Sequence, residues 1–333
     1  MNRSAKAVAV CLVVMLGVPT AGPASALVSG PSNYSTVTVS TSKTTSGADR
    51  QPKFVQKFNA KKISRLAMTN FNRYVKANKQ KKPRKVVFED GFTFPDRQWM
   101  NKLARDTVNA LPFQPGFVPL IVIAGSDEFI NEALRSDGKS GNSATYWCGR
   151  PTEREAYCAG SGWAGLNYKD SLARGFPIQD PGRRSAVAHE IFHVWHKTVD
   201  GSYGKPSNVD PRLPNGIPVW FAEGNANFFG YAMAQNSIWD NYFLGRESQV
   251  DRYMLTSSRP LREYIFWDTN PYGIGQAAAE YLVASVGMQR VLDVYINVGS
   301  GSTFAAAFEE GIGLPLEDFY NQFESVRANF TKR

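Results

Sequence analysis

Two histidines four residues apart constrain this chain more than any other feature. The segment from His189 to His193 has Glu190 in its second position, and a helix is predicted to begin just upstream, where Asp180 is a suitable N-cap and Pro181 suits the first helical position. On a helix, residues four apart lie on the same face. Two imidazole nitrogens on one face can bind one zinc ion at about 2.0–2.1 Å. The pattern therefore predicts a helix with two metal ligands.

The third metal ligand has to be acidic, because the chain has only three histidines and all of them lie between positions 189 and 196. A catalytic zinc ion takes three protein ligands and keeps one coordination position open. His196 lies on nearly the same side of the helix as His193, and ligands from three consecutive turns of a straight helix cannot converge on one ion. We therefore expect His196 beside the ligands or at the protein surface.

Glu223 is the best candidate for the third ligand. Residues 214–218 contain two prolines and a glycine, which indicates a turn, and the apolar segment Val219–Phe229 after it predicts a returning helix. Aromatic residues at both ends of this segment indicate that the helix is largely buried, and a buried glutamate needs a partner such as a metal ion. A lysine or arginine partner is the alternative, and Glu280 and Glu247 are the reserve candidates for the ligand.

Glu190 is the candidate general base. It lies at the rim of the helix face that carries His189 and His193, from where its carboxylate can reach a metal-activated water. Such a carboxylate takes the proton of the water and passes it to the leaving amine. The alternative is a chance histidine pair, because short motifs carry a risk of false positives.

The motif HEIFH at 189–193, followed by WFAEG at 220–224, resembles the gluzincin, or peptidase MA-like, family of zinc metallopeptidases. The resemblance covers roughly residues 96–330 and implies a zincin-like fold, a Zn2+ cofactor and a peptide or protein substrate. Metzincins are excluded, because their pattern continues with a glycine and a histidine where this chain has His196 and Val199. The segment Gly-Ala-Met-Glu-Asn of the classical aminopeptidases is absent, which disfavours exopeptidase activity.

The resemblance also implies roles around the metal. An aspartate often follows the glutamate ligand by four residues in this family and orients a ligating histidine; here Asn227 stands at that position, and its amide brings no charge. No histidine is left to stabilise the oxyanion, so the resemblance points to Tyr272, with Tyr231 as the alternative. It further implies that the strand near Trp163–Asn167 is a sheet edge that binds extended peptide by main-chain hydrogen bonds.

The N-terminus has the pattern of a signal peptide. Arg3 and Lys6 precede an apolar core, and the small residues Ala24 and Ala26 form a cleavage pattern at the end of residues 1–26. The apolar run is too short to remain as a membrane span, so we expect a secreted, extracellular protein. Residues 27–55 are rich in Ser and Thr and predict a flexible linker.

Residues 56–85 form a basic amphipathic segment. Within it, Ile63, Leu66 and Tyr74 recur at helical spacing, which predicts an amphipathic helix, and the stretch 50–85 contains thirteen Lys or Arg and no acid. The chain's net charge of +9 therefore comes from this stretch and the signal peptide. The segment could bind an anionic cell-wall polymer. Alternatively, it is a solvated helix packed on the domain, or part of a pro-segment that is cut within 79–85. Nucleic acid is not expected, because basic and aromatic residues are not interleaved there.

Cys148 and Cys158 are the cysteines that remain after cleavage, and in an oxidising compartment two cysteines this close in sequence predict a disulfide. A zinc site is the weaker alternative, since two thiolates alone do not form one.

Residues 86–333 predict one α+β domain: a small N-terminal mixed sheet with helices, then a mainly helical C-terminal part. Strands are expected at Lys85–Glu89, at Phe117–Ala124 and within 144–168, and a helix at Pro95–Leu111. We expect a monomer. The competing function is a non-catalytic exported protein that binds the cell wall or cell surface on a peptidase-like scaffold.

Overall fold

The computed structural model describes residues 53–139, 156–160, 162–173, 178, 180–199, 216–235, 242, 245–246, 249–250, 258–265 and 271–332, all within the compact unit Arg50–Arg333. The predicted signal peptide and most of the predicted linker lie outside these residues. Cys148 and Glu247 do as well, so the disulfide to Cys158 and the reserve role of Glu247 stay predictions. Among the described helices, none combines the length and apolar composition needed to cross a membrane.

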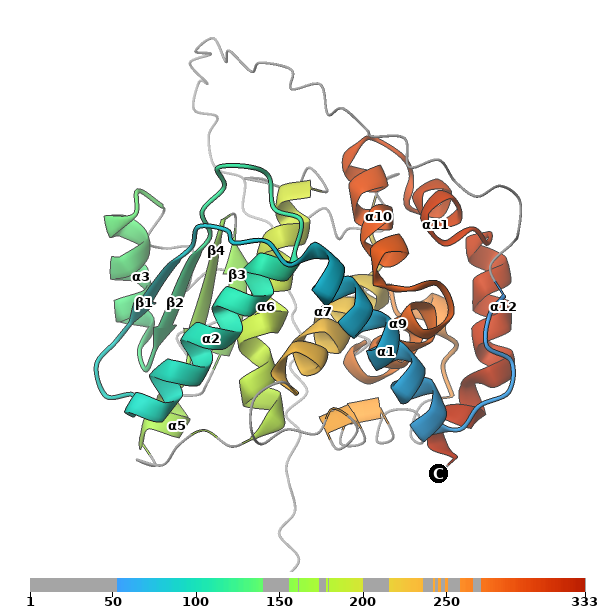
Figure 1. Cartoon of the computed structure of the whole chain (residues 1–333), viewed down its shortest axis with the longest axis horizontal. Coiled ribbons are helices and arrows are strands. Elements are labelled where there is room, and N and C mark those ends of the chain that lie inside the picture. Colours follow the sequence, from blue (N-terminus) through green and yellow to red (C-terminus); the bar gives the residue numbers. More distant parts are fainter. Residues whose placement is uncertain are drawn as a thin grey trace, which may run out of the picture. The chain divides into compact units, whose positions relative to one another are not determined.

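Four strands form one mixed sheet in the order β1-β2-β4-β3 (Figure 1). They are β1 (Lys85–Phe88), β2 (Leu120–Ala124), β3 (Ala156–Gly160) and β4 (Trp163–Asn167). β1 and β4 run parallel to β2, whereas β3 pairs antiparallel with β4. All five residues of β2 are buried, as expected for a parallel strand that is covered on both faces.

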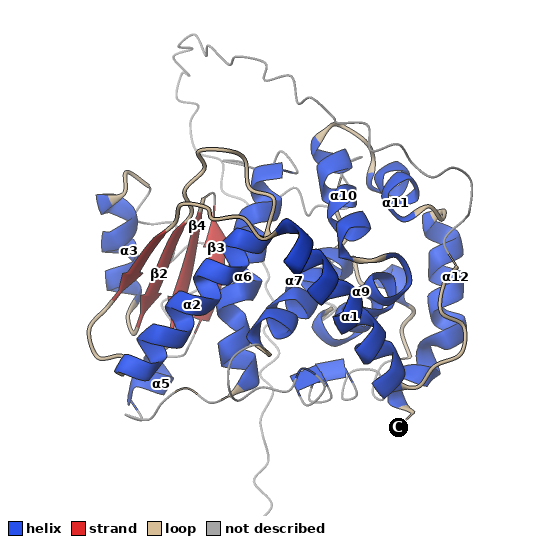
Figure 2. Cartoon of the chain, viewed as in Figure 1, coloured by secondary structure: helices blue, strands red, loops and turns tan. Residues whose placement is uncertain are grey.

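Helices make up most of the remaining described structure, as Figure 2 shows. They are α1 (Ala60–Asn78), α2 (Phe94–Ala110), α3 (Asp127–Ser136), α5 (Lys169–Ala173), α6 (Pro181–Val199), α7 (Val219–Ala234), α9 (Tyr272–Val286), α10 (Met288–Gly299), α11 (Phe304–Ile312) and α12 (Leu316–Val326), with short 3-10 turns at Leu261–Glu263 and Arg327–Thr331. A small mixed sheet followed by a mainly helical part confirms the predicted α+β class.

Polar side chains cap the start of five described helices: Asp180 at α6, as predicted, and Thr303 at α11 accept backbone hydrogen bonds in the same way as the caps of α1, α2 and α3. The side chains of Asn59, Thr93 and Ser126 each accept a hydrogen bond from a backbone N–H in the first turn of α1, α2 and α3. These bonds satisfy N–H groups that have no partner within the helix. Local sequence therefore determines these boundaries, before any tertiary contact is considered.

The two faces of the sheet are covered by different helices. Val122 of β2 packs with Ile130 and Leu134 of α3 on one face, while Ile121 and Ile123 belong to the main core on the other. That main core includes α2 and α6 and continues into the C-terminal helices. The helix that carries the histidine pair, α6, thus lies between the sheet and the helical part.

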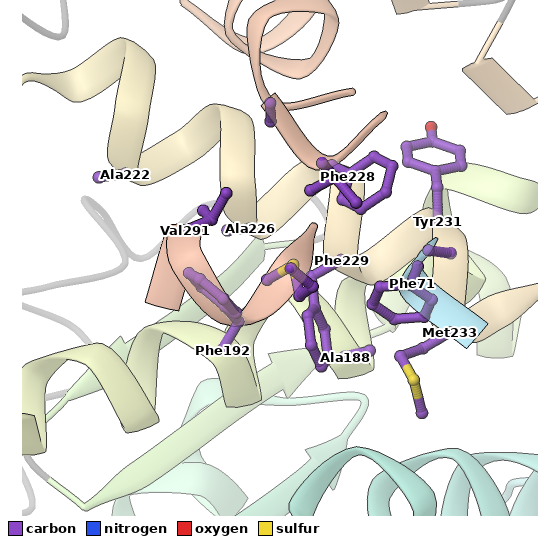
Figure 3. Packing of buried hydrophobic residues seen from close by; sticks show 14 of the residues in the cluster. Phe71, Ala188, Phe192, Ala222, Ala226, Phe228, Phe229, Tyr231, Met233 and Val291 are labelled. Carbon is purple, nitrogen blue, oxygen red and sulfur yellow. The ribbon is translucent and has the colours of Figure 1, made fainter. Parts of the chain in front are cut away.

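The basic helix α1 is part of this core. Its Phe71 is fully buried and packs edge-on against Phe228 and Phe229 of α7, at ring-centroid distances of 5.7 and 5.2 Å (Figure 3). The basic side chains Lys61 and Arg65 lie on the opposite, exposed face. The predicted amphipathic helix is therefore confirmed, and α1 belongs to the same compact unit as the residues after it.

Candidate metal centre

Close packing of α6, α7 and α9 brings the candidate ligands together. A Cβ added to Gly230 of α7 would lie 2.8 Å from the backbone oxygen of Ser185 on α6. A Cβ added to Gly224 would lie 2.2 Å from the backbone carbon of Gly275 on α9. Glycine at these positions is required because any side chain would separate the helices. Glu223, next to Gly224, is thereby held against α6.

The three predicted metal ligands form one buried cluster. The Nε2 atoms of His189 and His193 lie 3.0 Å apart, and the carboxylate of Glu223 reaches them at 3.3 and 3.2 Å. All of the potential ligand atoms lie within 4.8 Å of one another.

Two imidazoles and one carboxylate are a donor set that zinc takes. Ligands placed tetrahedrally at about 2.0–2.1 Å from one ion would lie about 3.3 Å apart, close to the spacing found here. The residues present therefore fit a zinc ion.

The charges of the cluster are balanced only by shared protons. Burial by itself would raise the pKa of Glu223, but the imidazoles of His193 and His189 outweigh it and lower that pKa. Burial would likewise lower the pKa of His189, but its hydrogen bond to Glu223 and the charge of Glu190 raise it. A divalent cation can replace such a proton, because metal binding to histidine releases protons.

Glu190 lies beside the cluster without belonging to it. Its Oε1 is 3.9 Å from Nε2 of His189, too far for a hydrogen bond. Burial raises the pKa of Glu190, while the neighbouring His189 and His193 oppose this effect. A carboxylate with a raised pKa is suited to exchange protons near neutral pH.

Two further predicted residues surround His189. The side chain of Asn227 hydrogen-bonds to His189, and the ring of Tyr272, at the start of α9, lies 6.4 Å from its ring. Tyr231, the alternative to Tyr272, has its hydroxyl near Gly182 at the start of α6, two helical turns before His189. The structure thus brings Asn227 and Tyr272 to the cluster, but not the hydroxyl of Tyr231.

The reserve ligand Glu280 lies in a separate buried cluster, so the structure does not support it as a metal ligand. Its Oε2 pairs with Nε of Arg246 at 3.0 Å, and its Oε1 accepts hydrogen bonds from Ser64 at 2.5 Å and Tyr242 at 3.1 Å. Both of its oxygens are bound to protein groups, with a permanent cation among them. The sequence could not separate it from Glu223 by burial, because both are buried.

His196 lies beside the ligands, which is the first of its two expected places: it is buried, with its ring 5.0 Å from that of His193 and 5.5 Å from that of Tyr295. One expectation was wrong. The strand Trp163–Asn167 is not an edge, because β4 pairs with β2 on one side and β3 on the other. Within the described sheet, the edge on that side is β3. Strand order depends on how the chain crosses over, which the local pattern does not specify.

Tyr295 was missed by the sequence analysis. Its hydroxyl donates to the backbone oxygen of Phe221 at 3.1 Å, and its ring packs on Phe192, Trp195 and Phe221. It therefore links α10 to both helices that carry ligands. Nothing in its local sequence distinguishes it from any other core tyrosine.

Comparison of the chain with known protein families, with curated proteins and with solved structures found no match. The gluzincin resemblance therefore rests on the short motifs of α6 and α7. What the site can do has to be argued from the geometry and chemistry of its own residues.

Proposed function

We propose that this chain is a secreted zinc-dependent peptidase with a gluzincin-type site and a zincin-like fold. One observation carries the proposal. Two imidazoles and one carboxylate converge in a buried cluster at the spacing of ligands around one ion, and no lysine or arginine among the described residues pairs with that carboxylate. A buried carboxylate of this kind needs a compensating charge.

Each residue of the site has a role in this proposal. His189, His193 and Glu223 hold the zinc ion, and Asn227 orients the ring of His189. When bound, zinc supplies Lewis acidity that activates water and polarises the scissile carbonyl. Glu190 accepts the proton of the attacking water and delivers it to the leaving amide nitrogen. The hydroxyl of Tyr272 donates a hydrogen bond to the developing oxyanion.

The arrangement of the sheet supports an extended peptide as substrate. α6 packs against β3 and β4, so the edge strand β3 borders the helix that carries the histidine pair. A peptide bound along this edge would form main-chain hydrogen bonds, as in other cases of strand addition. β3 therefore replaces β4 as the proposed substrate-binding edge.

The second candidate function is a non-catalytic binding protein on the same scaffold. Asn227 at the position of the expected aspartate and the exposed basic face of α1 favour it. The retained Glu190 argues against it, because a scaffold without catalysis has no use for a buried carboxylate beside the ligands.

The metal content of the purified protein tests the proposal first. We expect one zinc ion per chain by elemental mass spectrometry for the wild type, and loss of most of it for Glu223→Ala. Glu190→Gln should keep the zinc and lower turnover of a quenched-peptide library by about 10²–10⁴-fold, the usual contribution of a general base. A zinc-free wild type would contradict the proposal. A protein that contains zinc but does not cleave peptides would favour the second candidate function, a non-catalytic binding protein.

A further inference from the structure

A cavity of about 600 Å³ lies between the segment Lys79–Arg84 and the C-terminal half of α2, and it includes none of the proposed metal ligands. Its volume falls within the range of about 300–1,000 Å³ that is typical of small-molecule sites. The residues that line it are mostly cationic: Lys79, Lys81, Lys82, Arg84, Arg105, Asp106 and Asn109.

The charge of this cavity is not balanced by the residues that the structure describes. Five cations and one carboxylate give the lining a formal charge of +4. The carboxylate, Asp106, already pairs with Lys79 at 3.5 Å, with Lys102 at 2.9 Å and with Arg105 at 3.2 Å. Within the described part of the chain, neither Lys81 nor Arg84 has an ion pair. An excess of positive charge therefore faces the cavity.

Hydrogen bonds hold one wall of the cavity in place. The Nζ of Lys82 donates to the backbone oxygens of Asn109 and Leu111, at 3.3 and 2.6 Å, at the C-terminal end of α2. The backbone N–H of Lys82 donates to Oδ1 of Asn109, and that of Gln80 to its backbone oxygen. A cation at the C-terminus of a helix is favoured by the helix dipole. The segment is thus pinned to α2 rather than loosely attached.

Two of the five cations, Lys82 and Arg84, are partly buried in an environment that disfavours their charge, whereas Lys79, Lys81 and Arg105 are exposed. Burial, and then the nearby charge of Arg105, lowers the pKa of Arg84, although Asp106 opposes the shift. Burial also lowers the pKa of Lys82. The Nε of Arg84 is buried and has no hydrogen-bond partner within the described residues. A solvated basic face, such as that of α1, avoids these costs by spreading its charges in water.

We propose that this cavity binds the phosphate group of an anionic ligand, either a small phosphate ester or a polymer of phosphodiesters. A phosphate monoester carries a charge of about −1.5 to −2 near pH 7. A carboxylate carries a single charge, as does each phosphodiester, so a phosphodiester polymer would compensate the excess only through several of its phosphates. Guanidinium groups match the oxygens of phosphate in geometry, and the cavity offers those of Arg84 and Arg105. The site is independent of the proposed metal centre.

Calorimetric titration of the purified protein with two probes tests this site. Glycerol 1-phosphate represents the small ester, and a poly(glycerol phosphate) chain represents the polymer. The double variant Lys81→Gln/Arg84→Gln removes two charges from the cavity. The matched control, Lys61→Gln/Arg65→Gln, removes two charges from the exposed face of α1. Circular dichroism and thermal unfolding check that both double variants fold, and Lys81→Gln alone replaces the cavity variant if it does not.

We expect the cavity variant to bind at least about tenfold more weakly than the wild type, because hydrogen bonds from charged groups are the stronger ones. The control should stay within about twofold, since neither Lys61 nor Arg65 lines the cavity and their exposed charges are screened by salt. If both probes bind and both depend on the cavity residues, the site binds a single phosphate. If only the polymer binds in this way, the site requires repeated phosphates. Equal losses in the two double variants, or no binding of either probe to the wild type, would overturn the site.

Discussion

Glu223 and Glu280 are buried glutamates of the same compact unit, yet their partners differ in kind. Glu280 has the permanent cation of Arg246 at 3.0 Å and hydroxyl donors from Ser64 and Tyr242. Glu223 has two imidazoles at 3.2–3.3 Å, which are charged only when protonated. One cluster is complete within the protein, whereas the other needs a proton or a metal ion to balance its charge.

This difference separates a structural glutamate from a candidate ligand better than burial does. A buried ion pair holds its geometry because removal of one partner leaves the other charged and unpaired. A cluster of two histidines and a glutamate can exchange its protons for a divalent cation. The two sites should therefore respond to substitution and to metal to different extents.

The largest expected effect is on stability. Glu280→Gln should lower the free energy of unfolding by about 3–5 kcal/mol, because Arg246 becomes a buried charge without its partner. Glu223→Gln should cost about 1–2 kcal/mol in the metal-free protein, since its amide can still hydrogen-bond to the histidines. Equilibrium unfolding in urea with a chelator measures both values. Similar losses for the two variants would remove the distinction between the clusters.

Two tyrosines beside these clusters extend the comparison to catalysis. Tyr272→Phe should lower turnover by about 10²–10³-fold, the usual effect of losing an oxyanion donor, with little change in stability. Tyr242→Phe should leave turnover unchanged and lower the free energy of unfolding by about 1–3 kcal/mol, because Glu280 loses a buried donor. Peptide turnover and urea unfolding of both variants provide the measurements. If Tyr272→Phe retains full turnover, another group stabilises the oxyanion.

Zinc should stabilise only the cluster that lacks a permanent cation. A free zinc concentration of 100 times the Kd should add about 2.7 kcal/mol to the free energy of unfolding of the wild type. The same gain is expected for Glu280→Gln, whereas Glu223→Gln should gain much less. Urea unfolding with and without added zinc tests this. A gain that survives in Glu223→Gln would indicate that zinc binds elsewhere.

The smallest expected effect concerns pH. Burial, and then the charge of His193, holds the pKa of His196 well below its ordinary value, and neither ring nitrogen has a hydrogen-bond partner within the described residues. Below about pH 6.5, His196 is therefore protonated in the unfolded chain but stays neutral in the folded protein. The metal-free protein should lose up to about 1.4 kcal/mol per pH unit from this residue as the pH falls.

His196→Phe should remove this loss, because phenylalanine can pack in the same aromatic surroundings without a titrating group. The raised pKa of His189 acts in the opposite direction, with stability present at low pH and lost as the pH rises through that pKa. The difference between wild type and His196→Phe isolates His196. Urea unfolding of both metal-free proteins between pH 7 and pH 5 measures it, and parallel profiles would contradict the prediction.

Local patterns were sufficient wherever a feature depends on neighbours in the chain. The spacing of His189 and His193 predicted their shared face on α6, and the predicted helix starting at Pro181 is the one observed. The apolar run of β2 and the amphipathic pattern of α1 were also recognised, because periodicity reports which side of an element is buried. The α+β class followed from the order of these elements.

Features that depend on distant partners could not be predicted in this way. Strand order placed β3 rather than β4 at the edge, and packing decided between the two expected places of His196, which lies buried beside His193 and against Tyr295. Sequence ranked Glu223 above Glu280 through the turn before its helix, the aromatic residues around it and a short resemblance, none of which shows which partner each glutamate has. The basic cavity likewise requires the segment Lys79–Arg84 to meet α2.

By itself the sequence determined the elements, the pair of histidines and the types of residue that a metal would need. Only the tertiary structure decided which glutamate faces that pair and which one is neutralised by Arg246. The physical reason is that periodicity and capping are set by neighbours in the chain. The charge balance of a buried carboxylate is set by groups brought to it from elsewhere.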